Sequence, residues 1–405
     1  MLQRAISLAG LLVIIGLAWL MSSHRRTINW RVIAGGMLLQ FVFAILVLKT
    51  EPGQWLFASV GNLVTRMLDF VDAGASFVFG PNFHEFPFAF KVLPTIIFFS
   101  SLMSVMYYFG IMQWVTRLFA IVMQRVMNTS GAESLASAAN IFVGPTEAAL
   151  VIRPYIASMT GSELMAVMVG GFSNAAGGVL AVYITMGMNA GHLITASLIS
   201  APASLLLAKV MEPELGEPVT RGQVKMDVKI DAANVIHAAS TGAAEGLRLA
   251  LTVAAMIIAF LALIAMVDAG IAWIGAQFGW QWSLSEGLSY VFAPLAFVMG
   301  IEPADCLRVG ELLGKKVVAN EIVAFKQLAD WLAPDSLVHI SDRSRIIATY
   351  ALCGFSNLGT IGIQIGGIGP MAPEREAELA RFGLRAMLGG LLASCMTACI
   401  AGALI

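Results

Sequence analysis

The sequence has few charged residues. Asp, Glu, Lys and Arg make up 12% of its 405 residues, whereas hydrophobic residues make up 58%. An ordinary soluble domain carries about a quarter charged residues, so a soluble fold of this length is not expected. The net charge of -1 and the lack of a dense basic stretch also argue against nucleic acid as a partner.

Cysteine and histidine are also scarce. The four cysteines lie in apolar segments without a C-x-x-C pair, which is typical of reduced, packed thiols. The five histidines are scattered without metal-ligand spacing, and the sequence has no H-E-x-x-H, P-loop or G-x-S-x-G motif. ATP-driven transport and hydrolysis therefore lose most of their support, and no cofactor is expected.

Long apolar runs, in contrast, are abundant. A helix needs about 20 mostly apolar residues to cross the hydrocarbon core of a membrane. Windows without Asp, Glu, Lys or Arg predict eight membrane-spanning helices, two of which share the window 164–208 and are separated by a turn at 187–191. The other six windows cover residues 5–23, 32–48, 92–116, 249–267, 346–373 and 386–405.

The distribution of Lys and Arg predicts the orientation of these helices. The connections 189–191 and 269–285 have no Lys or Arg and are expected outside. Eight spans then place both termini outside, on the periplasmic side of a cell inner membrane. Basic residues gather instead in three connections that we expect to face the cytoplasm: Arg25, Arg26, Arg31, Lys209, Arg221, Lys225, Lys229, Arg375, Arg381 and Arg385.

Two segments are expected to enter the membrane without crossing it. Segments 130–159 and 303–331 each have the pattern of two short helices, with a break near 143–146 in the first and near 318–320 in the second. Irregular backbone at membrane depth is tolerated only where it is buried in protein or lines a wet cavity. We therefore expect these two re-entrant hairpins to lie at a binding site. The amphipathic stretches 54–70 and 113–127 are instead typical of interfacial helices.

An internal repeat relates the two hairpin regions. The motif G-F-S-N occurs at 171–174 and again at 354–357, and each copy follows a hairpin with a glutamate at its break. The charge map brings the two hairpins in from opposite sides, so the repeats are inverted, as in alternating-access transporters. The chain then divides into scaffold and interfacial helices (1–128), a first repeat (129–212), a cytoplasmic loop with a scaffold helix (213–282) and a second repeat (283–405).

The two hairpin glutamates are the first candidates for a binding site. Glu147 and Glu321 lie in apolar contexts, where an ionised carboxylate is costly unless it is paired or hydrogen-bonded. Their matched positions in the two repeats favour a role in ligand binding. The alternative is that each carboxylate forms a structural ion pair, with Arg153, Lys315 or Lys316 as the partner.

Asparagines at the helix breaks are the second group of candidates. Asn174 and Asn357 are expected where two spans are interrupted, and an amide that donates and accepts suits a sugar hydroxyl or a base edge. The alternative is that these amides only satisfy the interrupted backbone. Asn140 and the carbonyl of Val143, just before the first break, are candidates for coordinating a hard monovalent cation.

These motifs resemble those of the concentrative nucleoside transporter family. Residues 144–150, G-P-T-E-A-A-L, are similar to the family's G-Q-T-E-A-P-L, and residues 320–325, N-E-I-V-A-F, to its N-E-F-V-A-Y. Residues 350–357, Y-A-L-C-G-F-S-N, are similar to Y-A-L-C-G-F-A-N. The resemblance covers residues 131–373, and the flanking spans fit the family's bacterial eight-helix form.

The resemblance implies a homotrimer whose subunits import nucleosides together with a cation, sodium in the first interpretation. Each subunit has a fixed scaffold and a transport part that moves like an elevator. The resemblance also implies roles for individual residues: Thr146, Glu147 and Val179 contact the base, Glu321, Asn357 and Thr360 contact the ribose with Phe355 beside them, and Asn140, Val143 and Asn174 bind sodium.

Three positions depart from the family pattern. Pro145 replaces a base-contacting glutamine, which leaves the base preference open, and Ala149 replaces the usual proline. Asn174 replaces a Ser or Thr that supplies a sodium ligand, so a proton-coupled nucleoside symporter is an alternative. A membrane-embedded enzyme that uses Glu147 and Glu321, and a channel or receptor on the same scaffold, are further alternatives. For an enzyme, paired acids or a metal cluster are expected, and the sequence shows neither.

Overall fold

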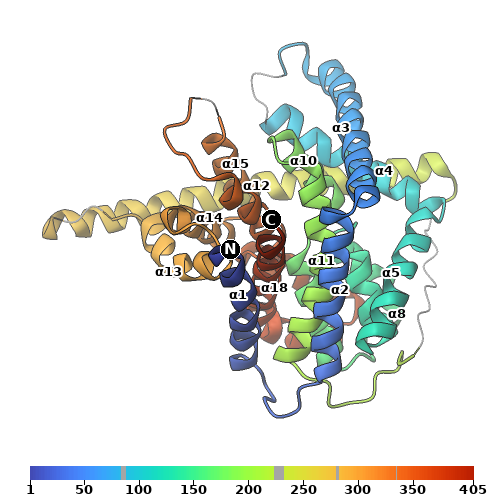
Figure 1. Ribbon diagram of the computed structural model, residues 1–405. Coiled ribbons are helices and arrows are strands. Elements are labelled where there is room, and N and C mark those ends of the chain that lie inside the picture. The colour runs from blue at the N-terminus through green and yellow to red at the C-terminus, as the bar shows by residue number, and fades with distance from the viewer. Residues whose placement is uncertain (84–87, 223–231, 280–281, 334) are drawn as a thin grey trace.

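The computed structural model describes residues 1–83, 88–222, 232–279, 282–333 and 335–405. Regular secondary structure in these ranges is helical, apart from one isolated β-bridge between Ser130 and Arg221. This confirms the predicted all-α fold (Figure 1). Lys225 and Lys229, on which the charge map partly rests, lie outside the described residues.

Seven helical stretches in the described ranges are long and apolar enough to cross a membrane, which supports a multi-pass membrane protein. Two of them contain a short preceding helix, η2 (Phe88–Val92) or η5 (Pro373–Arg375). The stretches are formed by α1 (Leu2–Leu20), α2 (Trp30–Lys49), α4 (Leu93–Tyr108), α9 (Gly161–Ser173) with α10 (Gly177–Thr185), α11 (Ala190–Met211), α12 (Val235–Phe278) and α18 (Glu376–Leu404).

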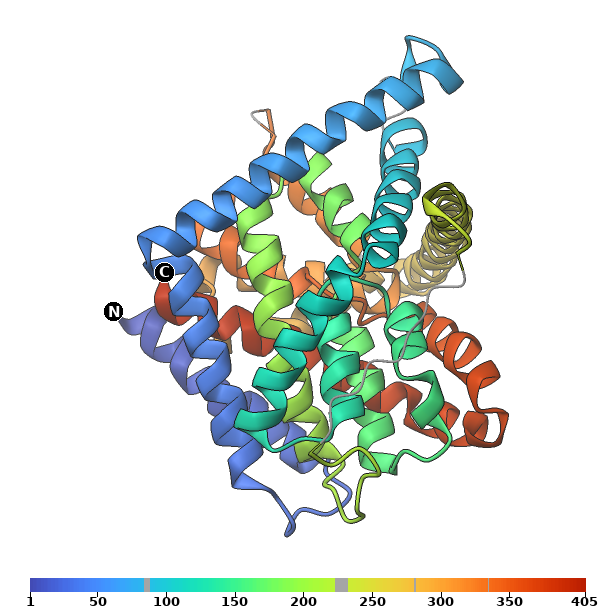
Figure 2. The same cartoon turned by 90° about the vertical axis from the view of Figure 1, so that its right-hand side faces the viewer.

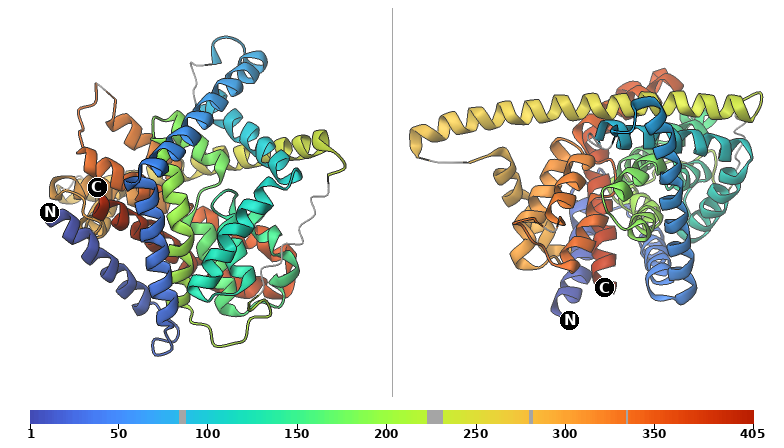
Figure 3. Two further views of the ribbon diagram at one scale, coloured as in Figure 1. Left: turned by 45° about the vertical axis from the view of Figure 1, so that its right-hand side comes forward. Right: turned by 90° about the horizontal axis from the view of Figure 1, so that it is seen from above.

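The longest helix, α12, differs from the prediction. Its 44 residues include the expected span 249–267 and most of the expected outside connection 269–285. Arg248 and Asp268 bound the uncharged window, but one charged residue does not end a helix, and α12 continues to its C-cap at Gly279. The helix crosses the molecule along one side (Figure 3).

The two amphipathic stretches are helical. Helix α3 (Glu51–Phe79) extends well beyond the predicted 54–70, and α5 (Ile111–Met127) agrees with 113–127. Helix α3 runs diagonally across α11 and reaches α4 and α10 (Figure 2). The expected span 92–116 is divided, because α4 ends at Tyr108 and α5 begins after Gly110. The interfacial position of α3 and α5 remains a prediction.

Both predicted hairpins are broken where the sequence indicates. The first consists of α6 (Gly131–Ala139), α7 (Pro145–Val151) and α8 (Arg153–Ile156), and the second consists of α14 (Cys306–Val318) and α15 (Glu321–Trp331). Pro145 starts α7 at a position where a missing N–H costs nothing. Asn320 caps α15 by accepting a hydrogen bond from the Val323 N–H at 3.0 Å. Helices α13 (Leu284–Val298) and η3 (Pro303–Asp305) precede the second hairpin.

Each hairpin is followed by an interrupted span and then by an unbroken helix. In the first repeat α9 and α10 are separated at 174–176 and α11 follows. In the second repeat, the predicted span 346–373 consists of α16 (Asp342–Leu352) and α17 (Leu358–Ile368), with the short helices η4 (Gly369–Met371) and η5 before α18. The repeats therefore agree in element order.

The two G-F-S-N motifs contact each other at the centre of the molecule. The Ser356 hydroxyl donates to the Phe172 carbonyl at 2.8 Å. Gly354 has a φ of +132°, and a Cβ atom there would lie 2.6 Å from the Ser173 carbonyl oxygen. A serine on the following helix also binds each break: Ser200 donates to the Ser173 carbonyl, and Ser394 donates to the Cys353 carbonyl.

The predicted basic connections lie together at one end of the fold. Arg385, in the third turn of α18, binds Glu212 at 3.0 Å and the carbonyls of Met21 and Met211. The termini also lie together, since Arg4 donates to the Ile405 carbonyl at 2.8 Å (Figure 2). The side of the membrane on which each group lies remains a prediction.

We predict that Gly354→Ala destabilises the protein, because alanine disfavours this backbone conformation and its methyl group meets the Ser173 carbonyl. Residues held in sparsely populated backbone regions cost of the order of 1–3 kcal/mol each, before the steric overlap is added. The melting temperature of the detergent-purified variant should fall clearly. Gly362→Ala is the control, since that helical position has open space around it and alanine favours helices. Equal melting temperatures for the two variants would contradict the prediction.

Candidate functional site

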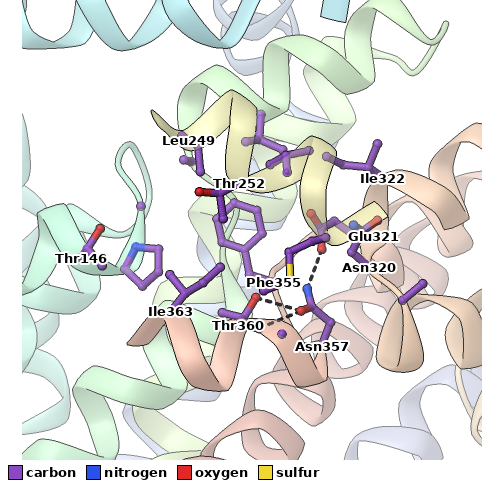
Figure 4. A pocket seen from close by; sticks show the side chains of 18 of the residues that line it. Thr146, Leu249, Thr252, Asn320, Glu321, Ile322, Phe355, Asn357, Thr360 and Ile363 are labelled. Carbon is purple, nitrogen blue, oxygen red and sulfur yellow. Dashed lines mark hydrogen bonds between the residues drawn. The ribbon is translucent and has the colours of Figure 1, made fainter. Parts of the chain in front are cut away.

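One pocket is formed jointly by both repeats and α12 (Figure 4). It contains every residue to which the family resemblance assigns a substrate contact, and also Pro145, but not Asn174; the roles of these residues as ligands remain predictions. The lining residues are Gly144, Pro145, Thr146 and Glu147 from the first hairpin, Ala176 and Val179 from α10, Ala319, Asn320, Glu321 and Ile322 from the second hairpin, Phe355, Asn357, Gly359, Thr360 and Ile363 from the break and α17, and Leu249, Thr252, Val253 and Met256 from α12.

Four helices begin at this pocket: α7, α10, α15 and α17. The first turn of a helix presents unpaired N–H groups and a partial positive charge, which favours carboxylates. Glu147 lies in the first turn of α7, and Glu321 is the first residue of α15. The arrangement therefore places two carboxylates at the pocket.

At one end of the pocket, Asn357 orients Glu321. The side chain of Glu321 is buried, and its Oε2 atom accepts a hydrogen bond from Asn357 Nδ2 at 3.1 Å (Figure 4). Asn357 Oδ1 in turn accepts from the N–H and the hydroxyl of Thr360, at 2.9 and 3.0 Å. Behind them the rings of Tyr183 and Phe325 stack at 4.1 Å. This end offers a fixed carboxylate acceptor.

At the other end, Glu147 folds back over the hairpin break. Thr146 Oγ1 donates to Glu147 Oε2 at 3.1 Å. The carboxylate contacts the place where Gly144 would carry a Cβ atom, so any larger residue there would displace it. Pro145 lines the pocket beside them and has no side-chain donor or acceptor. At this end Thr146 and Glu147 line the pocket with polar side chains.

The direct ion pairs weighed in the sequence analysis are not formed in the described part of the chain. Lys315 binds Glu311 at 2.8 Å, and Arg153 is exposed. Lys316 donates to the Ala351 carbonyl at 2.9 Å and to the Ser394 hydroxyl at 3.2 Å. The hairpin glutamates are therefore not bound to these cations by direct contact.

The predicted cation ligands Asn140, Val143 and Asn174 lie behind the first hairpin break, and all three are buried. A Cβ atom on Gly170, in the last turn of α9, would lie 3.1 Å from Asn140 Nδ2 and 3.5 Å from Ser137 Oγ. Ser137 Oγ, Asn140 Nδ2 and Asn174 Oδ1 have no hydrogen-bond partner among the described residues.

Unpartnered polar atoms of this kind are rare in protein interiors. Hard cations prefer oxygen ligands, and Asn174 Oδ1, the Ser137 hydroxyl and the Val143 carbonyl are oxygens, so the residues present fit such an ion. Sequence reasoning missed Ser137, although it lies on α6 three residues before Asn140, the C-cap of that helix, and this spacing places both on one side of the helix.

Sequence reasoning also missed the side of the pocket that α12 forms, which we call the α12 wall. Leu249, Val253 and Met256 supply most of this wall, and Thr252 supplies a hydroxyl that already donates to the Arg248 carbonyl. The spacing of the four residues, i, i+3, i+4 and i+7, indicates one face of a helix. An apolar face of this kind is expected on every spanning helix, so the pattern alone did not identify a pocket.

Three family models match successive parts of the chain. The model described as "Na+ dependent nucleoside transporter N-terminus" matches residues 9–82, and "Nucleoside recognition" matches residues 89–190. "Na+ dependent nucleoside transporter C-terminus" matches residues 192–402, which include the second hairpin and Asn357.

Curated relatives agree with these matches over nearly the whole chain. Solute carrier family 28 member 3 of Homo sapiens is 43% identical over 415 residues, which cover 99% of this chain and 60% of the relative. Sodium/nucleoside cotransporter 1 of Mus musculus is 43% identical over 416 residues, which cover 99% and 64%. The chain thus spans about three fifths of the length of these relatives.

Solved structures show the same fold. CNTnw in an inward-facing substrate-bound state superposes with a TM-score of 0.93 at 40% identity, covering 99% of this chain and 97% of that chain. A CNTnw variant in an outward-facing state has a TM-score of 0.94, also at 40% identity, and covers 99% and 98%. The matched models, the relatives and the shared fold together show that this chain belongs to the concentrative nucleoside transporter family.

Proposed function

We propose that this protein is a secondary active transporter that imports nucleosides together with sodium, and not an enzyme. The observation that carries the proposal is the pocket in which Glu321, Asn357 and Thr360 of the second repeat face Thr146 and Glu147 of the first. The names of the relatives, which are solute carriers and sodium/nucleoside cotransporters, support it.

The chemistry of the pocket fits a nucleoside. Glu321 and Asn357 provide an acceptor and a donor for the ribose hydroxyls, with Thr360 and Phe355 beside them. Thr146 and Glu147 provide polar contacts for the edge of the base, whose apolar faces suit Val179 and the α12 wall. Pro145 borders the base without a hydrogen bond.

We propose that alternating access occurs by an elevator movement, which the packing of the parts supports. Helices α9 to α11 and α18, in the repeats 129–212 and 283–405, are largely buried within the protein, whereas α12 is mostly exposed. We propose that the repeats move as a transport part against the scaffold of 1–128 and 213–282. The exposed apolar surface of the scaffold then faces lipid and the other subunits of a homotrimer in the cell inner membrane, with both termini periplasmic.

Sodium is the proposed coupling ion, held by Asn140, the Val143 carbonyl and Asn174, with Ser137 as a further ligand. The unpartnered buried oxygens of Ser137 and Asn174 support this assignment, as does the family's sodium dependence. The test of the whole proposal is uptake of labelled uridine and adenosine into proteoliposomes, with sodium and proton gradients imposed separately. Sodium-driven accumulation above the external concentration is expected, and equilibration without accumulation would indicate a channel instead.

We predict that Glu321→Gln nearly abolishes uptake of every nucleoside. The amide replaces a carboxylate that accepts ribose hydroxyl bonds, and hydrogen bonds to charged groups are worth about 1.5–3 kcal/mol each, or roughly tenfold to a hundredfold in affinity. Binding of uridine and adenosine to the purified variant measures the loss. Wild-type affinity in a variant that melts at the normal temperature would refute the ribose assignment.

Pro145→Gln should change the preference among bases more than it changes folding. Glutamine introduces a donor and an acceptor at the base end, where the proline offers neither. Competition between uridine and adenosine for uptake gives the preference, and the melting temperature serves as the folding control. A ratio that stays within about twofold of the wild type, less than roughly 0.5 kcal/mol, would mean that Pro145 does not border the base.

For sodium coupling, Asn174→Ala is the decisive variant. We expect it to raise the sodium concentration required for half-maximal uptake, because it removes a ligand oxygen, with little dependence on pH since the remaining ligands are neutral. Sodium titrations of uptake at two fixed pH values measure this. Uptake that a pH gradient drives alone, in sodium-free buffer and unaffected by the substitution, would replace sodium with a proton as the coupling ion.

A further inference from the structure

The two repeats place different groups at corresponding positions behind their hairpin breaks. In each repeat, a polar side chain near the end of the hairpin's first helix reaches the last turn of the first half of the broken span. In the first repeat this side chain is Asn140, which lies against Gly170 of α9. In the second repeat it is Lys316, whose Nζ atom donates to the Ala351 carbonyl of α16.

The Lys316 ammonium is held in the way that a monovalent cation would be held. The side chain is fully buried, and its bonds to the Ala351 carbonyl and the Ser394 hydroxyl are 2.9 and 3.2 Å long. The same hydroxyl donates to the Cys353 carbonyl, at the break between α16 and α17. No carboxylate of the described residues lies within ion-pair distance of Lys316, in contrast to its neighbour Lys315.

A buried charge without a compensating charge is costly. Around the Lys316 side chain lie the thiols of Cys395 and Cys353 and the buried carboxylate of Glu321, which is five residues further along the hairpin. Glu321 is also faced by Tyr183 from α10 and by Asn357 and Cys353 from the break before α17. Of these groups, only Lys316 carries a positive charge. The second repeat therefore contains both its carboxylate and a cation that balances it.

The first repeat lacks such a cation. Where the second repeat has a lysine, the first has the neutral side chains of Ser137, Asn140 and Asn174, each with an unpartnered polar atom. Glu147 is also outside ion-pair distance of any described Lys, Arg or His, and its own contact is with the Thr146 hydroxyl. A cation bound at these neutral groups would supply the positive charge that Lys316 supplies in the second repeat.

We propose that Lys316 is a fixed countercation of Glu321, occupying in the second repeat the place that the coupling cation occupies in the first. Transport then uses a single mobile cation per nucleoside, because the other cation is covalently part of the chain. The proposal rests on the proposed function, in that it takes Asn140 and Asn174 as the mobile cation's ligands and Glu321 as a substrate ligand.

The charge balance itself is tested by a double-mutant cycle that needs no substrate. We expect Lys316→Gln to lower the melting temperature of the purified protein, because it leaves Glu321 without its countercation. Adding Glu321→Gln should then restore stability, with the double variant melting about 3 °C or more above Lys316→Gln. Lys315→Gln, which removes the neighbouring lysine, is the matched control and should show no such rescue when combined with Glu321→Gln. Additive effects of Lys316→Gln and Glu321→Gln would overturn the proposal.

The functional consequence is tested by uridine binding at saturating sodium over a pH range. A carboxylate deprived of a nearby positive charge takes up a proton more readily, and a protonated Glu321 loses an acceptor for the ribose. We expect Lys316→Gln to bind uridine roughly tenfold more weakly at about pH 6 than at about pH 8.5. The wild type and Lys315→Gln should change less than about twofold. An affinity of Lys316→Gln that does not vary with pH would overturn the proposal, because a purely structural lysine predicts that result.

A third test measures how many sodium ions are transported with each nucleoside. Wild-type uptake should depend on sodium with a Hill coefficient near one, and direct counting should give one sodium per uridine. Two sodium ions per uridine would contradict the proposal.

The failure of the proposed function can be distinguished from the failure of the charge pair. If the wild type binds no nucleoside, the proposed function fails, whereas the double-mutant cycle of melting temperatures still decides whether Lys316 balances Glu321. If Lys316→Gln alone does not fold, recovery of folded protein on adding Glu321→Gln supports the charge pair, and failure to recover it excludes the pair.

Discussion

Four helices, α7, α10, α15 and α17, begin at the pocket, and their first N–H groups have no preceding turn to bind them. In an apolar interior these groups require other partners. Asn320 and Asn357 supply them through side-chain caps, Pro145 has no N–H, and Gly177 donates to the Phe142 carbonyl in the first hairpin break. The same breaks position the two glutamates of the pocket. The short segments that provide partners for the N–H groups at the helix breaks therefore also form the pocket.

The contrast between the two sides of the pocket suits the proposed movement of the repeats past α12. The repeats contribute hydrogen-bonded polar groups, such as Glu321 with Asn357, whereas α12 contributes the apolar wall of Leu249, Val253 and Met256. Specific hydrogen bonds thus lie mostly within the repeats and not across the boundary with α12. An apolar boundary without directional bonds loses little when one side slides along the other, since dispersion contacts are reformed at each position.

The sequence predicts the parts of this fold that have a local cause. Gly144 with Pro145, and Asn320 with Glu321, mark the hairpin breaks, and the repeated G-F-S-N motif marks the interrupted spans. The full length of α12 was not predicted, because an uncharged window measures where charges lie and not where a helix ends. The α12 wall and the place of Ser137 depend on which helices meet in three dimensions. The contact between Ser356 and Phe172 joins residues 184 positions apart, a separation about which local patterns carry no information.

That contact also imposes an order on biosynthesis. The first repeat emerges with the Phe172 and Ser173 carbonyls exposed at a break in an apolar span, and Ser200, only 27 residues later, can bind Ser173 early. The Phe172 carbonyl receives its hydrogen bond only when Ser356 has been synthesised, after the second hairpin. The first half of the chain is thus inserted as an incomplete intermediate, which is expected to need the insertion machinery or water around its break until the second half arrives. A chain that stopped between the two repeats would leave the Phe172 carbonyl without the hydroxyl donor that Ser356 provides.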